Sequence, residues 1–215
     1  MDDRQKWLTG VILAGGQNRR MGGQPKAMLK LQGRSFVERQ LEELGKVCKE
    51  ILIIANDAAL FEKLVQGANS GSIRIIPDQH PGKGPLAGMQ AAMRSAQGEA
   101  MWVVACDMPH VSGAAACAMM EELDLAGQHW DAVVPVLHGK IQPLHAVYRI
   151  KSCREIVDDM LETAQYKVME LLQRLNYRET DEQFFARMGI AADFALNINE
   201  PAQYEQLLGL RTDTF

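Results

Sequence analysis

Short apolar runs alternate with longer helical patterns in the first half of the chain. The runs have the length of strands and lie at Leu8–Ala14, Glu50–Ala55, Ser72–Pro77 and Met101–Ala105. Apolar residues at helical spacing predict helices between them, over 35–47, Ala58–Gln66 and Pro85–Ala96. This alternation is typical of a parallel sheet with helices on both faces. We therefore predict an α/β fold, a three-layer sandwich.

Local signals predict where helices begin. The segment Ser35-Phe-Val-Glu38 matches a capping box, in which the serine and the glutamate satisfy each other's backbone N–H groups. Pro85 suits the first position of a helix because its missing N–H would have no helical partner there. Ser112 is a suitable N-cap for the helix predicted after the fourth strand.

The second half of the chain has a different pattern. Ala132–Val136 and Leu144–Tyr148 predict a hairpin or strands of mixed direction at the edge of the sheet, with a turn at 138–140. The remaining predictions are helices over Cys153–Glu162, Lys167–Leu175 and Pro201–Leu208, and a weak strand at Tyr177–Thr180. No repeat or Gly/Ser linker interrupts the 215 residues, so we expect a single domain over 1–215.

Charge and cysteine usage exclude several classes. The 23 Lys+Arg and 27 Asp+Glu give a net charge of −4, whereas nucleic-acid binders usually carry a basic excess. No apolar run approaches the length of a bilayer span, so no membrane partner is expected. The acidic opening MDDRQKWLTG is unlike a secretory signal. Four scattered cysteines without a C-x-x-C pair predict reduced thiols in a cytoplasmic protein.

Polar or glycine residues follow each of the four predicted strands. Gly15 and Gly16 follow the first, Asn56 the second, Asp78 the third and Asp107 the fourth. In open α/β sheets, ligands bind beyond the carboxyl ends of the strands. The sequence therefore predicts a ligand site at that edge.

The connection after the first strand has the composition of a phosphate site. It reads LAGGQNRRMGGQPK over 13–26 and holds four glycines, two arginines and one lysine. Glycines allow backbone N–H groups to line a phosphate, and Arg19, Arg20 and Lys26 supply charge-assisted donors. The segment is neither a Walker A loop nor a G-x-G-x-x-G fingerprint.

Asp107 ends a buried strand and suits a Mg²⁺ ligand. Mg²⁺ needs few protein oxygens and takes the others from water and phosphates. The alternative role, a helix cap, is already met by Ser112.

Asn197 and Asn199 lie before the last helix, where they could form a turn and cap or meet a ligand. No pair of histidines has the spacing of a transition-metal site, and no G-x-S-x-G elbow supplies a nucleophile.

The segment over 13–26 resembles the signature L-A-G-G-x-x-x-R-M-G-x-x-D-K of the molybdenum cofactor guanylyltransferases, within the nucleotidyltransferase superfamily. Further similar segments follow in the family's order. They are Asp78, GPLAG at 84–88, CDMP at 106–109, PLHAVY at 143–148 and NINEP at 197–201. The combination of these segments is specific to the molybdenum cofactor branch.

The resemblance implies a sandwich of the nucleotide-diphospho-sugar transferase type with a mainly parallel central sheet. It implies transfer of GMP from GTP to molybdenum-bound molybdopterin, with release of pyrophosphate and with Mg²⁺ as cofactor. It also implies contact with other proteins of molybdenum cofactor biosynthesis and with acceptor molybdoenzymes.

The resemblance assigns nucleotide binding to eight positions, Leu13, Ala14, Gly15, Gly16, Lys26, Asn56, Asp78 and Asp107. Lys26 would contact the phosphates, and Asn56 and Asp78 the nucleoside. Arg20, Lys26 and Asp107 would form the catalytic group, with Asp107 also holding Mg²⁺. Asn197 and Asn199 would lie towards the pterin acceptor.

One position departs from the family pattern. Pro25 stands where the signature has an aspartate. A proline before the lysine is familiar from sugar and alcohol nucleotidyltransferases of the same superfamily. This leaves CTP-dependent cytidylyl transfer to the same or another phosphorylated acceptor as one alternative. A non-catalytic protein that binds a nucleotide or cofactor is the other.

Overall fold

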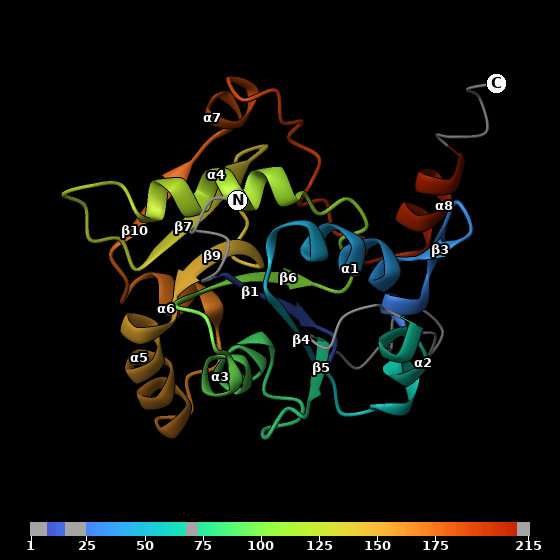
Figure 1. Cartoon of the computed structure of the whole chain (residues 1–215), viewed down its shortest axis with the longest axis horizontal. Helices are drawn as coiled ribbons and strands as arrows, with labels where there is room; N and C mark the ends of the chain where they lie inside the picture. Colours follow the sequence, from blue (N-terminus) through green and yellow to red (C-terminus); the bar gives the residue numbers. More distant parts are fainter. Residues whose placement is uncertain (1–7, 16–24, 68–72, 210–215) are drawn as a thin grey trace.

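The computed structural model describes residues 8–15, 25–67 and 73–209, and its centre is an eight-stranded sheet (Figure 1). The strands follow the order β10-β7-β9-β6-β1-β4-β5, and β8 pairs with β7. Their bounds are β1 Leu8–Leu13, β4 Glu50–Ile54, β5 Ile73–Ile76, β6 Ala100–Ala105, β7 Ala132–Leu137, β8 Lys140–Ile141, β9 His145–Arg149 and β10 Tyr177–Thr180. The first strand therefore lies inside the sheet, with β4 on one side and β6 on the other.

Strand direction confirms the prediction of a mainly parallel sheet. β1 pairs in parallel with β4 and β6, β4 with β5, and β7 with β10. β9 runs antiparallel to both β6 and β7, as the prediction of mixed direction requires. The turn at His138 and Gly139 closes a hairpin between β7 and β8.

The predicted edge position of these strands is wrong. β7 and β9 lie inside the sheet, and the strand at this edge is β10. The burial patterns give the physical reason. Four successive residues of both β7 and β9 are buried, as expected for strands covered on both faces, whereas two of the four residues of β10 are exposed.

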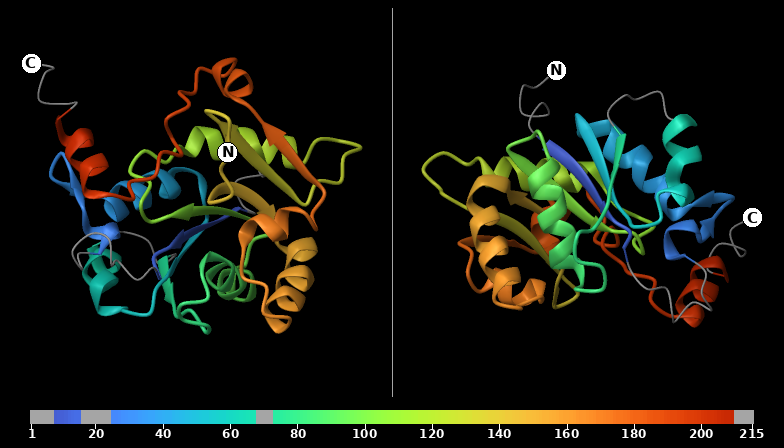
Figure 2. Two further views of the ribbon diagram at one scale, coloured as in Figure 1. Left: turned by 180° about the vertical axis from the view of Figure 1, so that it is seen from behind. Right: turned by 90° about the horizontal axis from the view of Figure 1, so that it is seen from below.

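Helices cover both faces of the sheet, which confirms the three-layer sandwich (Figures 1 and 2). α1 and α4 lie on one face and α3 and α5 on the other. The helix bounds are α1 Phe36–Val47, α2 Ala59–Gly67, α3 Pro85–Ser95, α4 Gly113–Leu123, α5 Ile150–Glu162, α6 Val168–Leu172, α7 Glu182–Ala186 and α8 Pro201–Gly209. The 3₁₀ helix η3 (Lys26–Met28) and the small hairpin of β2 (Lys30–Leu31) and β3 (Arg34–Ser35) precede α1.

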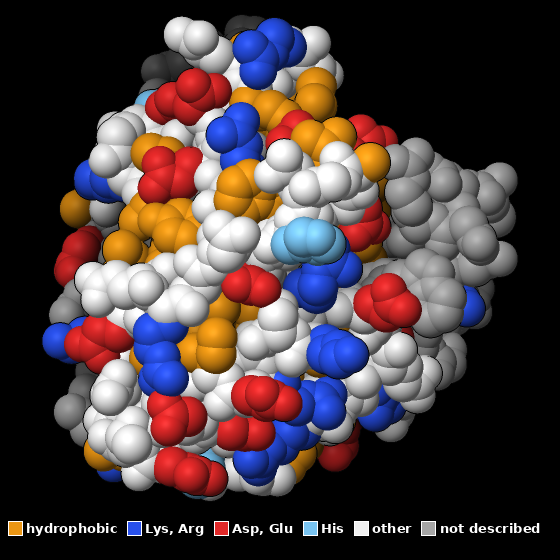
Figure 3. Space-filling model, turned by 90° about the vertical axis from the view of Figure 1, so that its left-hand side faces the viewer, with side chains coloured by type: hydrophobic (Ala, Val, Ile, Leu, Met, Phe, Trp, Pro, Cys, Tyr) orange, Lys and Arg blue, Asp and Glu red, His pale blue; other side chains and the backbone are white. Residues whose placement is uncertain are grey.

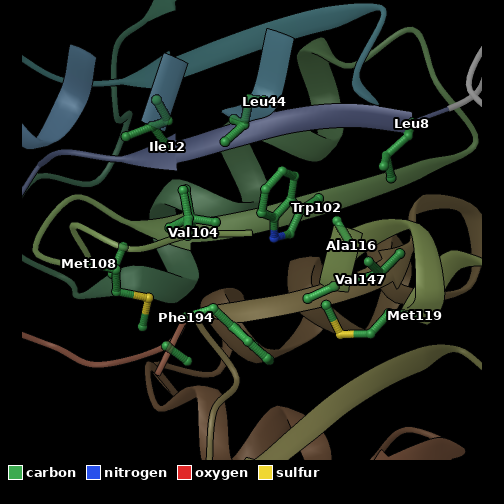
Figure 4. Close-up of a cluster of buried hydrophobic side chains, with 14 of the residues drawn as sticks. Leu8, Ile12, Leu44, Trp102, Val104, Met108, Ala116, Met119, Val147 and Phe194 are labelled. Atoms are coloured by element: carbon green, nitrogen blue, oxygen red, sulfur yellow. The ribbon is translucent and has the colours of Figure 1, made fainter. Parts of the chain in front are cut away.

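Each face of the sheet has its own core. Trp102 of β6 is fully buried on the α1 and α4 face, among Leu8, Leu44, Val104 and Met119 (Figure 4). On the other face, buried residues of α3 and α5 pack on β1, β6 and β9. Burying both faces leaves the strand ends as the places where backbone and polar groups meet solvent.

The predicted helix starts are confirmed. Ser35 and Glu38 form the capping box reciprocally, and Pro85 is the first residue of α3. Ser112 Oγ accepts from Ala115 N at 3.2 Å and caps α4. The elements that were not predicted are short: η3, β2, β3, β8 and α7 have two to five residues each, too few to produce a periodic pattern.

The outer face at the β10 and α5 end carries Lys and Arg side chains interspersed with Asp and Glu (Figure 3).

Among the helices of the described ranges, none combines the length and the apolar character that spanning a bilayer requires.

β1 approaches α1 closely at Gly10. A Cβ added there would lie 2.6 Å from Leu44 Cδ2 and 3.1 Å from Cys48 Sγ. Leu44 is fully buried, so its side chain has little room to move away. The glycine therefore allows α1 to pack directly on the strand that leads to the ligand edge.

Gly10→Ala should destabilise the protein by about 1 kcal/mol or more, because overpacking forces a buried neighbour out of place. Gly45→Ala on the exposed side of the same helix is the matched control, since a Cβ there has nothing within 4 Å. It should stabilise by about 0.5–1 kcal/mol, because glycine is a poor helix former. Urea unfolding of both variants measures the two effects, and equal changes would contradict the packing argument.

Candidate active site

Lys26, Asp107 and Asn199 meet at the carboxyl edge of the sheet. Lys26 Nζ lies 3.0 Å from Asp107 Oδ2 and donates to Asn199 Oδ1 at 2.8 Å. The Lys26 and Asp107 side chains are only 16% and 15% exposed. Three residues that lie far apart in the sequence thus form one polar cluster, and all three were predicted site residues.

η3 positions Lys26. Pro25 precedes it in an extended conformation, with φ −61° and ψ 122°, and its carbonyl accepts from Met28 N at 2.9 Å. Ala27 is buried, and the largely buried Lys26 directs its ammonium group to Asp107. The buried Ala27 and the hydrogen bond between Met28 and Pro25 therefore fix the backbone on both sides of Lys26.

A tight turn after β6 positions Asp107. Met108 N donates to Ala105 O at 3.2 Å, which closes the turn, and Cys106 N donates to Leu13 O at 3.2 Å. Ile198 N donates to Asp107 O at 2.9 Å. β1, β6 and the segment before α8 therefore hold the backbone around this carboxylate.

The second carboxylate oxygen of Asp107 differs from the first, which pairs with Lys26. Within the described residues, Asp107 Oδ1 is buried and has no hydrogen-bond partner. The same part of the chain contains no group of three or more His, Cys, Asp and Glu side chains that could hold a metal ion. One carboxylate oxygen with open lone pairs suits a hard divalent cation that takes its other ligands from phosphate and water.

The predicted nucleotide residues lie beside this cluster. Ala14, Gly15 and Asn56 line a pocket of about 180 Å³ together with Pro25 and Lys26. The pocket therefore combines backbone from the end of β1 with the lysine of the polar cluster.

Asp78 reaches the same edge from the end of β5. Asn56 Oδ1 accepts from Asp78 N at 3.1 Å, and Asp78 Oδ1 accepts from His80 N at 2.8 Å. A Cβ on Gly15 would lie 3.9 Å from Asp78 Oδ2, so this carboxylate faces the end of β1. Leu13 contacts the helix behind, where a Cβ on Gly88 would lie 3.0 Å from its side chain.

Some predicted site residues cannot be placed. Gly16, Arg19 and Arg20 lie outside the described residues. Asn197 is described, and its Oδ1 is buried without a hydrogen-bond partner in that part of the chain. Asn199 accepts from Lys26, and its N–H donates to Gln203 Oε1 of α8 at 2.7 Å, which supports the role of a turn and cap before α8.

Cys106 lines the pocket but is not a nucleophile. Burial, and after it the neighbouring Asp107 carboxylate, raises the pKa of its thiol to about 12. The thiol is therefore neutral at physiological pH.

Comparison with known proteins identifies the family. The model of the MobA-like NTP transferase domain matches residues 10–180. The chain belongs to this family. A probable molybdenum cofactor guanylyltransferase of Pelotomaculum thermopropionicum is 37% identical over 197 residues, which is 90% of this chain and 88% of the relative.

Solved structures agree with this assignment. Molybdopterin-guanine dinucleotide biosynthesis protein A of Archaeoglobus fulgidus is 26% identical, with TM-score 0.78, over 96% of this chain and 100% of that one. A Mycobacterium tuberculosis protein solved in complex with manganese shares the fold alone, at TM-score 0.64 and 15% identity over 95% and 98% of the two chains. The predicted nucleotidyltransferase fold and family are thus confirmed.

Three residues near the site of this MobA-like protein were not predicted. Gln40 of α1 and Tyr204 of α8 give no signal in the sequence, because their partners are backbone groups far away along the chain. Tyr204 Oη accepts from Lys30 N at 3.1 Å and donates to Lys30 O at 2.7 Å, which ties α8 to the hairpin after η3. His145 of β9 is the third.

His145 is fully buried between two aromatic rings. Its ring centroid lies 5.2 Å from that of Trp102 and 4.6 Å from that of Phe194. Ser112 N donates to His145 Nε2 at 3.3 Å. Burial lowers the pKa of His145 to about 3, so the ring is neutral in the folded protein.

Lys26→Ala should weaken GTP binding by about 10–100-fold, because charge-assisted hydrogen bonds to phosphate are lost. Guanosine, which has no phosphate, should bind within about twofold of its wild-type affinity. Lys30→Ala removes an exposed lysine nearby and should change neither affinity. Isothermal titration measures these constants, and equal losses for GTP and guanosine would show that Lys26 acts through structure.

Acid should destabilise the protein through His145. The unfolded chain binds a proton with the ordinary pKa of 6.5, whereas the folded protein does so only near 3, so the free energy of unfolding falls as the pH drops below 6.5. By pH 5 the loss amounts to about 2 kcal/mol. In His145→Phe this part of the pH dependence should disappear, whereas the exposed His129→Ala should retain it. Urea unfolding between pH 7.5 and 5 tests this, and an unchanged slope in His145→Phe would contradict it.

Proposed function

We propose that this protein transfers GMP from GTP to molybdenum-bound molybdopterin, releasing pyrophosphate and forming the guanine dinucleotide form of the cofactor. The observation that carries the proposal is the cluster of Lys26, Asp107 and Asn199 at the carboxyl edge of the sheet. The names of the relatives and the family membership support guanylyl transfer over other nucleotidyl transfers.

In the proposed reaction, an oxygen of the acceptor phosphate attacks the α-phosphorus of GTP in line. The bond from that phosphorus to the bridging oxygen breaks, and pyrophosphate leaves with the bridging oxygen. The acceptor phosphate is already ionised at neutral pH, so no general base is needed. Catalysis then depends on positioning and on cations that stabilise the charge.

The residues take roles that suit this chemistry. Lys26 neutralises negative charge on the phosphates, and Arg20 stabilises charge in the transition state. The backbone at Leu13, Ala14, Gly15 and Gly16 lies along the nucleotide. These assignments follow the family resemblance, and the glycine-rich composition of the segment and the pocket lined by Ala14 and Gly15 support the backbone part.

The remaining residues divide between nucleoside and acceptor. Asn56 and Asp78 bind the nucleoside part, which their linked positions beside Gly15 support. Asn197 and Asn199 face the molybdopterin acceptor, and the buried Asn197 oxygen supplies an open acceptor for a ligand N–H or O–H group.

Asp107 would hold Mg²⁺ through its open oxygen Oδ1. When bound, the ion supplies Lewis-acid stabilisation of phosphoryl oxygens. Lys26 and the turn from Ala105 to Met108 orient the carboxylate for this ligand.

We further propose that residues 1–215 form a single nucleotidyltransferase domain in the cytoplasm. One sheet containing strands from Leu8 to Thr180 supports the single domain. The four cysteines are free thiols, which suits a reducing compartment. GTP and molybdopterin are the small-molecule partners, and other cofactor-biosynthesis proteins and acceptor molybdoenzymes are the protein partners.

Isothermal titration with GTP, CTP and ATP in Mg²⁺ should give selective GTP binding. Asp107→Asn keeps the size of the side chain but removes its charge, and should lower Mg²⁺-dependent guanylyl transfer about a hundredfold or more. Asp158→Asn is the matched control, because Asp158 accepts from Gln90 and Arg94 between α3 and α5, away from the site.

Each other result contradicts one part of the proposal. Selective CTP binding would overturn the base preference and point to Pro25, which lines the pocket. Full activity in Asp107→Asn would overturn the metal role. Nucleotide binding without turnover of a reconstituted acceptor would indicate a non-catalytic binding protein.

A further inference from the structure

Gln40 of α1 reaches into the turn that carries Asp107. Its side chain is fully buried, with 0% exposure. Gln40 Nε2 donates at 2.8 Å to Ala105 O and at 2.8 Å to Met108 O. These two carbonyls begin and end the turn, so one amide group links its two ends.

The two hydrogen bonds have different consequences for the turn. Ala105 O also accepts from Met108 N, so it would keep a partner without Gln40. For Met108 O, by contrast, Gln40 is the hydrogen-bond donor that the described residues supply. A change at Gln40 therefore affects the residue directly after Asp107.

The geometry also fixes the orientation of the Gln40 amide. Only its nitrogen can donate to two carbonyls, so Oε1 must point elsewhere, and it is buried without a partner in the described part of the chain. An unpaired buried oxygen costs stability. An apolar side chain would avoid this cost, so packing alone does not account for a glutamine at position 40. Its two hydrogen bonds hold the turn.

α1 also holds the segment that carries Lys26. Phe36 N, at the start of the helix, donates to Leu29 O at 2.8 Å, and Leu29 N donates to Lys26 O at 3.1 Å. Arg39 Nε donates to Pro109 O at 3.2 Å, just beyond the turn. One helix therefore contacts the backbone next to both partners of the ion pair.

We propose that Gln40 is a positioning residue that orients the Asp107 carboxylate and thereby sets how strongly a divalent cation supports nucleotide binding. The inference rests on the proposed function, since it assumes that Asp107 binds the cation together with GTP. Gln40 does not touch the ligand in this proposal and acts through the Ala105 and Met108 carbonyls.

The test compares GTP affinity with saturating Mg²⁺ and with EDTA, by isothermal titration of the full-length protein. The ratio of the two dissociation constants measures the contribution of the cation. Gln40→Met preserves length and volume but removes both donors. It should reduce this ratio about tenfold or more, the usual effect of removing a residue that supports a metal ligand.

Thr9→Val is the matched control. Thr9 is also fully buried on β1, and its hydroxyl donates to Glu50 Oε1 at 2.8 Å. Losing that hydrogen bond should lower the melting temperature while leaving the Mg²⁺ ratio within about twofold of wild type. If Gln40→Met yields no folded protein, Gln40→Asn, whose amide is one methylene short, takes its place in the same titration.

The outcomes separate the two proposals. A lowered melting temperature with an unchanged Mg²⁺ ratio in the Gln40 variant would overturn the positioning role. So would equal reductions of the ratio in the Gln40 and Thr9 variants. A wild-type protein whose GTP affinity does not depend on Mg²⁺ would instead overturn the metal part of the proposed function, and this inference with it.

Discussion

The ion pair between Lys26 and Asp107 is the contact around which the site is built. It joins residues 81 positions apart, and both side chains are largely buried. A buried charge that loses its partner is strongly destabilising, so each of the two residues can stay buried only because the other is present. β6 supplies the carboxylate, η3 supplies the ammonium group, and Asn199 gives the lysine a second oxygen. The order of β1, β4 and β6 in the sheet brings these segments to one edge.

Much of the architecture was predictable because local patterns and tertiary structure agree. The strands β1, β4 and β6 are continuous apolar runs, and each ends where a glycine or polar residue begins the connection. Ser35, Ser112 and Pro85 mark helix starts by chemistry that acts within a few residues. The family motifs then placed Lys26 and Asp107 in one site before any distance between them was known.

The rest depended on contacts that sequence periodicity does not encode. β7 and β9 were expected at an edge because a turn separates two apolar runs, but the pairing of β10 with β7 decides the edge. Gln40 lies on the buried face of α1, where an apolar residue would fit the pattern equally well. Its role is visible only from the carbonyls of a turn that is far away in the sequence. The same holds for Tyr204, whose partner is a backbone in the first hairpin.

Lys26 pairs with only one of the two oxygens of Asp107, and this has a consequence for binding. Lys26 donates to Asp107 and Asn199, the same groups that would serve a cation and an acceptor. A cation at Oδ1 of Asp107 would be repelled by the nearby ammonium group, whereas a nucleotide phosphate would attract that group and weaken the repulsion. Each ligand then lowers the cost of binding the other, because the phosphate offsets the repulsion between the cation and the ammonium group. Under the proposed function, GTP and the divalent cation should bind cooperatively, with the coupling free energy set by the strength of this ion pair.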